Sequence, residues 1–130
     1  MVSADEMSAR AKAYAKAWSS GDPGGVASFY AEDGEIEING GDPMKGRAAI
    51  AEMASGFYVE FPDLVVHCDG FRMGGKYAVF NWTLEGQHSE TKNYVKVPGW
   101  EEWELTEDGF VAVSRGRFDA REYDRQVAGG

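Results

Sequence analysis

The chain has 130 residues, of which 43% are hydrophobic and 27% are charged, and its formal net charge is -9 at pH 7. This length predicts one domain, residues 1–130, with a single substantial core. The acidic balance excludes partners that require a basic surface, so we expect neither nucleic acid nor an anionic membrane as a partner.

The N-terminal stretch predicts a helix. Ser3 and Glu6 have the spacing of a capping box, and a helical pattern follows through Ser19. Apolar residues recur there every three or four positions, which places them on one face of the helix. This face consists of Met7, Ala11, Tyr14 and Trp18.

Two further helices and a short strand are expected in the first half of the chain. Asp22 and Pro23 suit the N-cap and the first position of a second helix. Its apolar side consists of Val26, Phe29 and Tyr30. Residues 35–39 alternate as a short strand does, and residues 46–57 predict a third helix. The apolar face of that helix consists of Ile50, Met53 and Phe57.

In the second half of the chain the pattern changes to strands, whose side chains alternate between two faces. Residues 64–73 and 76–86 predict a hairpin that turns at Gly74 and Gly75. The second of these strands has one richly aromatic face. It consists of Ala78, Phe80, Trp82 and Leu84. Residues 88–98 are polar and less regular.

The last predicted hairpin places a carboxylate on an apolar face. Its strands are residues 99–105 and 110–118, joined by an Asp-Gly turn, and a short charged tail with a helical pattern follows. The period of two puts Glu101 on the same face as Trp103 and Leu105. A carboxylate there is costly unless it is paired or protonated. The alternative is a slipped register or a bulge that returns Glu101 to solvent.

Helices first and a long meander of strands last predict an α+β fold. One curved antiparallel sheet wraps around the N-terminal helices and leaves a conical interior, which either fills with aromatic rings or opens as a pocket. Candidate ligand-binding residues on the inward faces are either large and apolar or very small. They are Trp18, Phe57, Phe80, Trp82, Trp103, Ser114, Gly116 and Phe118.

Several features predict a cytoplasmic protein without bound metal. No apolar run reaches the roughly 18 residues of a membrane span, and the N-terminus lacks the apolar core of a signal peptide. With Cys68 as the single cysteine, no intrachain disulfide can form. His67 and Asp69 share a strand face, but two potential ligands without a third do not make a metal site. We therefore expect no metal and no cofactor.

Five segments of the chain resemble the nuclear-transport-factor-2-like superfamily, which includes ketosteroid isomerases, SnoaL-type polyketide cyclases and limonene epoxide hydrolases. They occur in the family's order and span nearly the whole chain. They are AYAKAWSSGD (13–22), FYAEDGEIE (29–37), KGRAAI (45–50), FPDL (61–64) and EDGFVAVSRGRFD (107–119). The resemblance implies a SnoaL-like domain with a cone-shaped α+β fold, a deep pocket and often a homodimer through the outer face of the sheet.

The resemblance also implies part of an active site. Ketosteroid isomerases bind an oxyanion with a tyrosine of the first helix and a protonated aspartate; Tyr14 matches the tyrosine, and Glu101 falls at the aspartate. The isomerase base would fall at Ile38, which cannot take a proton. The cyclases and epoxide hydrolases have two aspartates near the last strand; the first falls at Gly116, and Asp119 matches the second. The resemblance thus implies the pocket and leaves the reaction open.

The motifs do not supply the missing base. His88 and Tyr94 lie in the polar stretch that could form the pocket rim, and either is a candidate. Asp119 shares the outer face of the last strand with Arg115 and Arg117. A turn or a helix cap is expected for the aspartate, and ion pairs or a dimer contact for the arginines.

Two functions are compatible with these residues. In the first, the protein is a cofactor-independent isomerase, cyclase or lyase that binds a small, mostly apolar polycyclic or aromatic carbonyl compound. Tyr14 and Glu101 then donate hydrogen bonds to the developing enolate. In the second, the same fold is a non-catalytic ligand-binding or interaction module, as the absent aspartates suggest. In either case Tyr77, Val79 and Trp100 on the outer face predict a homodimer.

Overall fold

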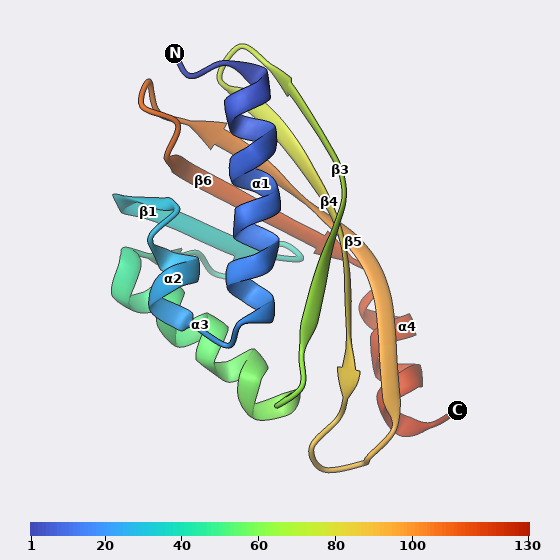
Figure 1. Cartoon of the computed structure of the whole chain (residues 1–130). Helices are drawn as coiled ribbons and strands as arrows, with labels where there is room; N and C mark the ends of the chain where they lie inside the picture. Colours follow the sequence, from blue (N-terminus) through green and yellow to red (C-terminus); the bar gives the residue numbers. More distant parts are fainter.

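The computed structural model describes residues 1–130 (Figure 1). The helices are α1 (Ala4–Ser19), α2 (Pro23–Ala27), α3 (Arg47–Glu60) and α4 (Ala120–Ala128). The strands are β1 (Tyr30–Ile38), β2 (Met44–Lys45), β3 (Val65–Gly74), β4 (Tyr77–Gln87), β5 (Tyr94–Leu105) and β6 (Val111–Phe118). None of the helices is both long and apolar enough to cross a membrane.

The six strands form one curved, open sheet in the order β2-β1-β6-β5-β4-β3. All neighbouring strands are antiparallel except β1 and β6, which run parallel. Helix α1 lies across one face of the sheet in Figure 1, α2 and α3 lie beside its lower end, and α4 lies next to β5. The predicted α+β class, with a curved sheet around the N-terminal helices, is confirmed.

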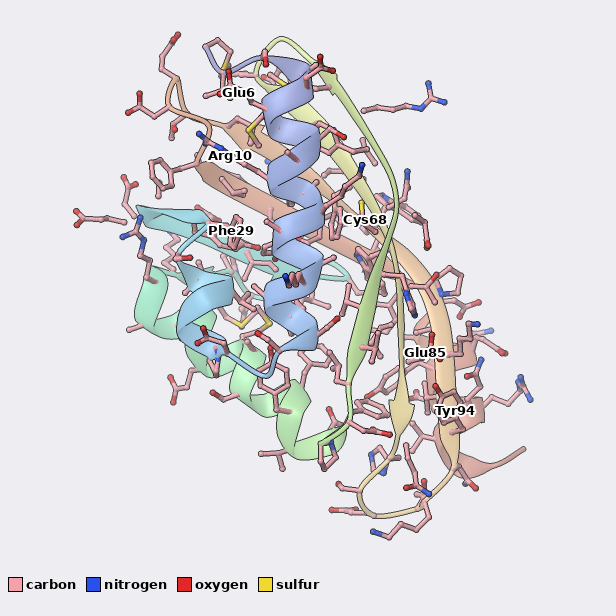
Figure 2. The ribbon with its side chains drawn as sticks, viewed as in Figure 1. Glu6, Arg10, Phe29, Cys68, Glu85 and Tyr94 are labelled. Atoms are coloured by element: carbon pink, nitrogen blue, oxygen red, sulfur yellow. The ribbon has the colours of Figure 1, made fainter.

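Helix α1 begins where the sequence predicts. The Ser3 hydroxyl accepts a hydrogen bond from the Glu6 backbone N–H at 3.1 Å, which satisfies one free donor of the first turn. The predicted apolar face is buried. It consists of Met7, Ala11, Tyr14 and Trp18. One turn further along, the Arg10 guanidinium donates to the Asp108 carbonyl at 2.8 Å and so joins α1 to the β5–β6 turn (Figure 2).

The second helix is shorter than predicted. Helix α2 ends at Ala27, so the prediction that Phe29 and Tyr30 lie on its apolar side is wrong, and only Val26 of the predicted face belongs to it. Tyr30 instead begins β1, where it lies opposite Val111 of β6. The short strand β2, which the sequence pattern did not indicate, then pairs with β1. Pairing with distant strands therefore sets the start of β1, over residues whose local pattern is helical.

Strand β5 extends into the stretch that was expected to be irregular before Gly99. It pairs with β4 from Tyr94 onward. Pro98 removes no ladder hydrogen bond, because the side of β5 to which its nitrogen points has no partner strand there. The N–H of Lys96 points to that same side and donates to Gln126, and β6 ends opposite Gly99. A strand tolerates a proline whose nitrogen faces a free edge. The sequence pattern alone does not show that this part of β5 has such an edge.

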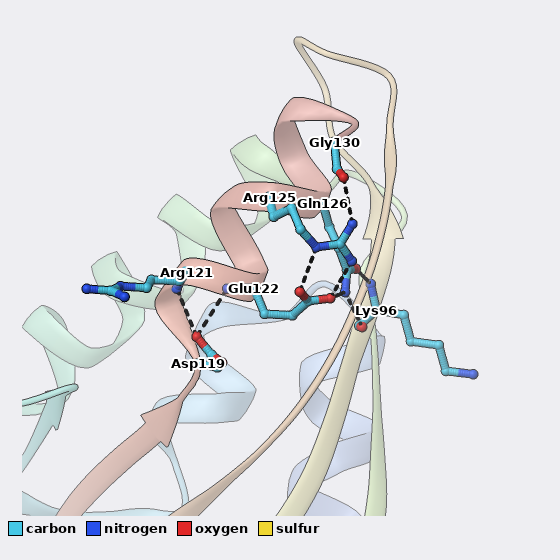
Figure 3. Close-up of polar contacts among 7 residues, drawn as sticks. All are labelled: Lys96, Asp119, Arg121, Glu122, Arg125, Gln126 and Gly130. Carbon is cyan, nitrogen blue, oxygen red and sulfur yellow. Dashed lines mark hydrogen bonds and ion pairs between the residues drawn. The ribbon is translucent and has the colours of Figure 1, made fainter.

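Helix α4 is fixed to β5 by polar side chains (Figure 3). Its N-cap is Asp119, whose carboxylate accepts hydrogen bonds from the backbone N–H groups of Arg121 and Glu122 at 3.0 and 3.1 Å. The Gln126 amide accepts from the Lys96 N–H at 2.6 Å and donates to the Lys96 carbonyl at 3.1 Å. The helix thus covers the edge of β5 that β6 leaves free. The predicted helical tail and the cap role of Asp119 are confirmed.

Candidate functional site

Glu101 lies on the inward face of the sheet, as the strand period predicts. It is opposite Phe80 on β4 and Gly116 on β6, and 6% of its surface is exposed. Trp103 on the same face is buried as well, whereas Trp100 on the opposite face is 41% exposed. No slipped register or bulge returns Glu101 to solvent.

Hydrogen-bond donors surround one oxygen of the Glu101 carboxyl. Its Oε1 accepts from Ser114 Oγ at 2.7 Å and from Trp103 Nε1 at 2.9 Å. The hydroxyls of Tyr14 and Tyr30 lie 3.1 and 3.3 Å from the same oxygen. Oε2 has one such neighbour, the Tyr14 hydroxyl at 3.3 Å. The carboxyl therefore has one oxygen that the protein holds and one that is nearly free.

The two tyrosines form a hydrogen-bonded pair behind this carboxyl. Their hydroxyl oxygens are 2.7 Å apart, and both side chains are fully buried. Two phenols have two protons, and one of these serves the bond between them. Only one tyrosine at a time therefore donates to Glu101, and the pair is a short chain of hydrogen bonds that ends at the carboxyl.

Burial dominates the protonation of this network. Desolvation raises the pKa of Glu101, although hydrogen bonds from Trp103, Ser114 and the two tyrosines oppose the shift. Burial, and after it the nearby charge of Glu101, raises the pKa of Tyr14 and of Tyr30 well above the usual value. The tyrosines thus remain donors, and Glu101 is the group of this network whose pKa moves toward neutrality.

A pocket opens beside Glu101, between the sheet and helices α1, α3 and α4. Its cavity volume is about 50 Å³, so the pocket is narrow. Thirteen residues line it, and eleven of them are hydrophobic. Apart from Glu101 they are Trp18, Ile36, Ile38, Met53, Phe57, Val66, Trp82, Leu84, Val97, Gly116, Phe118 and Tyr123. A narrow apolar slot with one carboxyl suits a flat, mostly apolar molecule.

The pocket wall contains five of the eight predicted ligand-binding residues. These five are Trp18, Phe57, Trp82, Gly116 and Phe118. The other three lie behind the wall, where a ligand in this pocket does not reach them. Phe80 and Trp103 stack on each other with ring centroids 5.4 Å apart, and Ser114 is fully buried against Glu101. Ser114 and Trp103 donate hydrogen bonds to Glu101, and Phe80 packs on Trp103.

Tyr14 and Glu101 meet, as the sequence predicts, but only one of them reaches the pocket. Glu101 lines it, whereas Tyr14 is fully buried and does not. The Tyr14 hydroxyl is engaged by Tyr30 and by Glu101. The structure therefore places Tyr14 behind Glu101, and not in the wall of the pocket.

Tyr30 and Tyr123 belong to the site but were missed in the sequence. Tyr30 continues the helical spacing of the residues before it, and only its pairing with β6 makes it part of a strand. Tyr123 reaches the pocket because α4 packs over β5, a contact that no local pattern encodes. Ile36 and Ile38 could have been found, since they alternate on the inward face of a predicted strand.

The two positions at which the resemblance places a catalytic acid have none. Ile38 and Gly116 both line the pocket. A Cβ at Gly116 would meet only the Glu37 carbonyl oxygen at 3.6 Å and Ile38 Cγ1 at 3.8 Å, so the glycine leaves room beside Glu101. Glu101 is therefore the single carboxyl of the pocket lining.

His88 and Tyr94, the candidates for the missing base, lie away from the pocket. The His88 ring is buried, and its Nδ1 accepts hydrogen bonds from the backbone N–H groups of Glu90 and Thr91 at 3.3 Å, so it stabilises its own turn. Tyr94 is 57% exposed and donates to Glu85, beside which it lies in Figure 2. Neither residue lines the pocket, so neither is placed to act as the base.

Solved structures share this fold at low sequence identity. A hypothetical protein with a ketosteroid isomerase-like fold from Catenulispora acidiphila, in complex with trimethylamine, is 17% identical; the match covers 96% of this chain and 94% of that one, with a TM-score of 0.84. TsrD from Streptomyces laurentii is 16% identical, with 98% of each chain covered and a TM-score of 0.85. SalBIII, an epoxide hydrolase/cyclase-like enzyme in pyran ring formation, is 20% identical, with 91% and 92% covered and a TM-score of 0.76. At these identities the similarity shows the fold alone.

The family is shown by the sequence itself. No curated protein matches this chain. The SnoaL-like domain profile, however, matches residues 11–114. This range runs from the middle of α1 to β6 and includes Tyr14, Tyr30, Glu101 and Ser114. The chain belongs to the SnoaL-like domain family.

Proposed function

We propose that the protein binds a small, flat, mostly apolar carbonyl compound in this pocket and exchanges a proton with it through Glu101. The reaction is then a cofactor-independent isomerisation, cyclisation or elimination next to the carbonyl group. The observation that carries the proposal is the placement of Glu101. Its carboxyl is the single one of an apolar pocket, and its Oε2 has almost no partner within the protein.

One carboxyl suffices for such a reaction because it is regenerated. Ionised Glu101 takes a proton from the carbon next to the carbonyl, the C–H electron pair forms the enolate double bond, and the carbonyl oxygen takes the negative charge. The neutral acid then returns the proton to another atom of the same molecule. Burial supports this exchange, because a raised pKa brings the acid and base forms of Glu101 closer in free energy at neutral pH.

The residues behind Glu101 serve as positioning residues in this proposal. Ser114 and Trp103 hold Oε1 at 2.7 and 2.9 Å, so the carboxyl cannot rotate freely. The tyrosine pair supplies one further donor, and a hydrogen bond to a carboxylate is stronger than one to a neutral acid. Tyr14 therefore contributes by stabilising the ionised form of Glu101, in place of the direct contact with an enolate.

Family and fold support this reaction class at a coarse level. The chain belongs to the SnoaL-like family, and it shares its fold with SalBIII, an epoxide hydrolase/cyclase-like enzyme. A second function, a non-catalytic ligand-binding module, is favoured by one observation. Ile38 and Gly116 leave the pocket without a second acid or base, and some reactions of this class require two.

Deuterium exchange of a simple ketone tests the proposal. The probe is α-tetralone, a flat bicyclic ketone, whose hydrogens next to the carbonyl exchange with heavy water when a base removes them. We expect the wild-type protein to accelerate this exchange, and Glu101→Gln to lose it by a factor on the order of 10²–10⁴, the usual contribution of a general base. Mass spectrometry of the ketone measures the rate.

A neighbouring carboxylate provides the matched control. Glu102 is exposed on the opposite face of the same strand, so Glu102→Gln makes the same chemical change outside the pocket and should leave the exchange intact. Tryptophan fluorescence reports the binding of α-tetralone in each variant. Binding without any acceleration by the wild type would favour the non-catalytic module. An equal loss in the two variants would place the reaction elsewhere.

A further inference from the structure

Trp82 carries the one buried side-chain nitrogen or oxygen that has no hydrogen-bond partner, its indole Nε1. The side chain lines the pocket and is 9% exposed. By contrast, the indole N–H groups of Trp100 and Trp103 donate to Glu102 and Glu101, each at 2.9 Å. A buried donor without an acceptor is unfavourable and rare in folded proteins. Trp82 lines the pocket while its donor is covered and unpaired, and this combination points to a ligand that displaces part of the wall.

Packing holds the Trp82 ring in place. Gly99 lies directly opposite Trp82 on β5, and a Cβ there would clash with the indole carbons Cζ2 and Cη2. The glycine thus lets the ring lie across β5. The ring of Phe118 packs against it with centroids 6.1 Å apart. These contacts hold the indole in a position where its N–H has no acceptor within the protein.

The sheet brings this free donor close to the free oxygen of Glu101. On β4, Trp82 follows two residues after Phe80, which is the residue opposite Glu101, so Trp82 and Glu101 are diagonal neighbours on the inward face. The backbones of such neighbours are about 7–8 Å apart, which is within reach of aromatic and long side chains. In a ketone the carbonyl oxygen and the adjacent carbon are close together, so one ligand can face both residues.

We propose that the Trp82 indole N–H binds the carbonyl oxygen of the ligand and stabilises the charge that this oxygen acquires when Glu101 removes the adjacent proton. The inference deepens the proposed function and rests on its ligand class. It gives Trp82 the contact that the sequence assigned to Tyr14, whose hydroxyl is engaged behind Glu101. The pocket is narrow, so a ligand reaches the N–H by separating wall residues, among which Phe118 and Tyr123 are only half-buried.

Nitrogen-15 NMR of the indole N–H groups tests this contact. The chain has four tryptophans, and the Trp82 signal is the one that disappears in Trp82→Phe. The probes are α-tetralone and tetralin, which has the same bicyclic skeleton without the carbonyl. We expect the Trp82 N–H proton signal to move downfield with α-tetralone and not with tetralin. The signal of Trp100, on the opposite face of the sheet, should stay unchanged with both probes.

Kinetics separate this role from a purely structural one. Loss of one donor to a developing oxyanion typically lowers the rate by roughly 10²–10³, so we expect Trp82→Phe to lower kcat for ketone exchange by this factor while tetralin still binds. Equal shifts of the Trp82 signal with both probes would overturn the proposal, as would a signal already downfield in the free protein because a water molecule is bound.

The outcomes also distinguish this inference from the proposed function. If the Trp82 signal responds to α-tetralone alone but Glu101→Gln retains the exchange, the acid–base role of Glu101 fails and the carbonyl contact stands. If the exchange depends on Glu101 while the Trp82 signal does not respond to the ketone, the contact fails and the acid–base role stands. If neither probe binds in the pocket, both are overturned.

Discussion

The uneven distribution of hydrogen bonds over the Glu101 carboxyl determines which substitution mimics its neutral form. Donors from Ser114, Trp103 and the tyrosine pair converge on Oε1. A neutral Glu101 therefore carries its proton on Oε2, on the side of the carboxyl with few protein contacts. Glutamine in the same orientation keeps a carbonyl oxygen at Oε1 and places its NH₂ group at Oε2. Glu101→Gln is thus a permanent copy of the protonated residue.

The pH dependence of stability follows from the raised pKa of Glu101. Burial lifts the folded-state pKa above the unfolded value of about 4.3. Between these two values the folded protein binds a proton that the unfolded chain releases, so the free energy of unfolding falls as pH rises through this window. The free energy of unfolding of Glu101→Gln does not fall in this way, because glutamine does not titrate. We expect it to match the wild type below about pH 4 and to exceed it above the folded pKa, by about 1.4 kcal/mol for each tenfold difference in proton affinity between the folded and unfolded states.

Urea unfolding at a series of pH values measures this difference. Glu52→Gln serves as the control, because that carboxylate is exposed on α3, away from both faces of the sheet. Its difference from the wild type should not grow with pH in the way expected for Glu101→Gln. A constant difference between Glu101→Gln and the wild type across the range would contradict the raised pKa.

At the scale of elements, helix α4 is held by its N-cap, by polar contacts with β5 and by the partly buried side chains of Tyr123 and Val127 (Figure 3). Asp119→Ala removes the two hydrogen bonds of the N-cap, and the loss of such a cap costs about 0.5–2 kcal/mol. We therefore expect the amides of α4 to exchange with heavy water roughly two- to thirtyfold faster, while those of β5 opposite β4 stay protected.

Asp124 offers the comparison within the same helix. It is exposed in the middle of α4, and its side chain makes no hydrogen bond, so Asp124→Ala removes a carboxylate without removing a cap. Its amide exchange should match that of the wild type. Equal acceleration in the two variants would mean that net charge, and not the cap, holds the helix.

Some elements could be predicted from the sequence because their signals are local. Helix α1 has both a cap at Ser3 and an apolar face, and the structure shows both. The start of β1 at Tyr30 and of β5 at Tyr94 could not be predicted, since pairing with a distant strand overrides the local pattern at each. Pro98 is a local signal that misleads, because its meaning depends on which strand lies next to it.

At the scale of the whole molecule, the outer face of the sheet is uncovered. Tyr77 and Trp100 are 57% and 41% exposed there, in a shallow groove that also contains Val79. The groove also includes Arg115 and Glu102, so a second copy that packs on it by two-fold symmetry can meet each charge with the opposite one. We predict a homodimer through this face.

Light scattering at micromolar concentration tests the dimer. One chain has a mass of 14.2 kDa, and we expect twice that mass for the wild type. Trp100→Lys should yield the monomer, because it buries a charge in the apolar centre of the interface. Val59→Lys makes the same kind of change on α3, where the side chain is 73% exposed, and should leave the mass unaltered. A wild-type monomer would contradict the prediction.

The site could be predicted in part because strand alternation is a local rule. It placed Glu101, Trp82, Gly116 and Phe118 on the inward face, where all four line the pocket. Helical spacing, a second local rule, did the same for Trp18 and Phe57. The sequence could not predict which of Tyr14 and Glu101 lies nearer to the pocket. The answer depends on how α1 packs on the sheet, which places Tyr14 behind Glu101. No sequence pattern could predict the unpaired N–H of Trp82, because the absence of an acceptor is known only once the positions of all neighbouring atoms are known.

The contact between Gln126 and Lys96 affects the tendency of the protein to aggregate. A strand edge with free N–H and C=O groups is a template on which strands of other molecules can assemble into aggregates. Beyond the end of β6, such an edge remains on β5, and the Gln126 amide occupies both backbone groups of Lys96 while Pro98 offers no N–H. Helix α4 thus blocks the addition of strands from other molecules at this edge, and its Tyr123 forms part of the pocket wall. A movement of α4 that breaks both hydrogen bonds of Gln126 with Lys96 would expose this edge to other molecules.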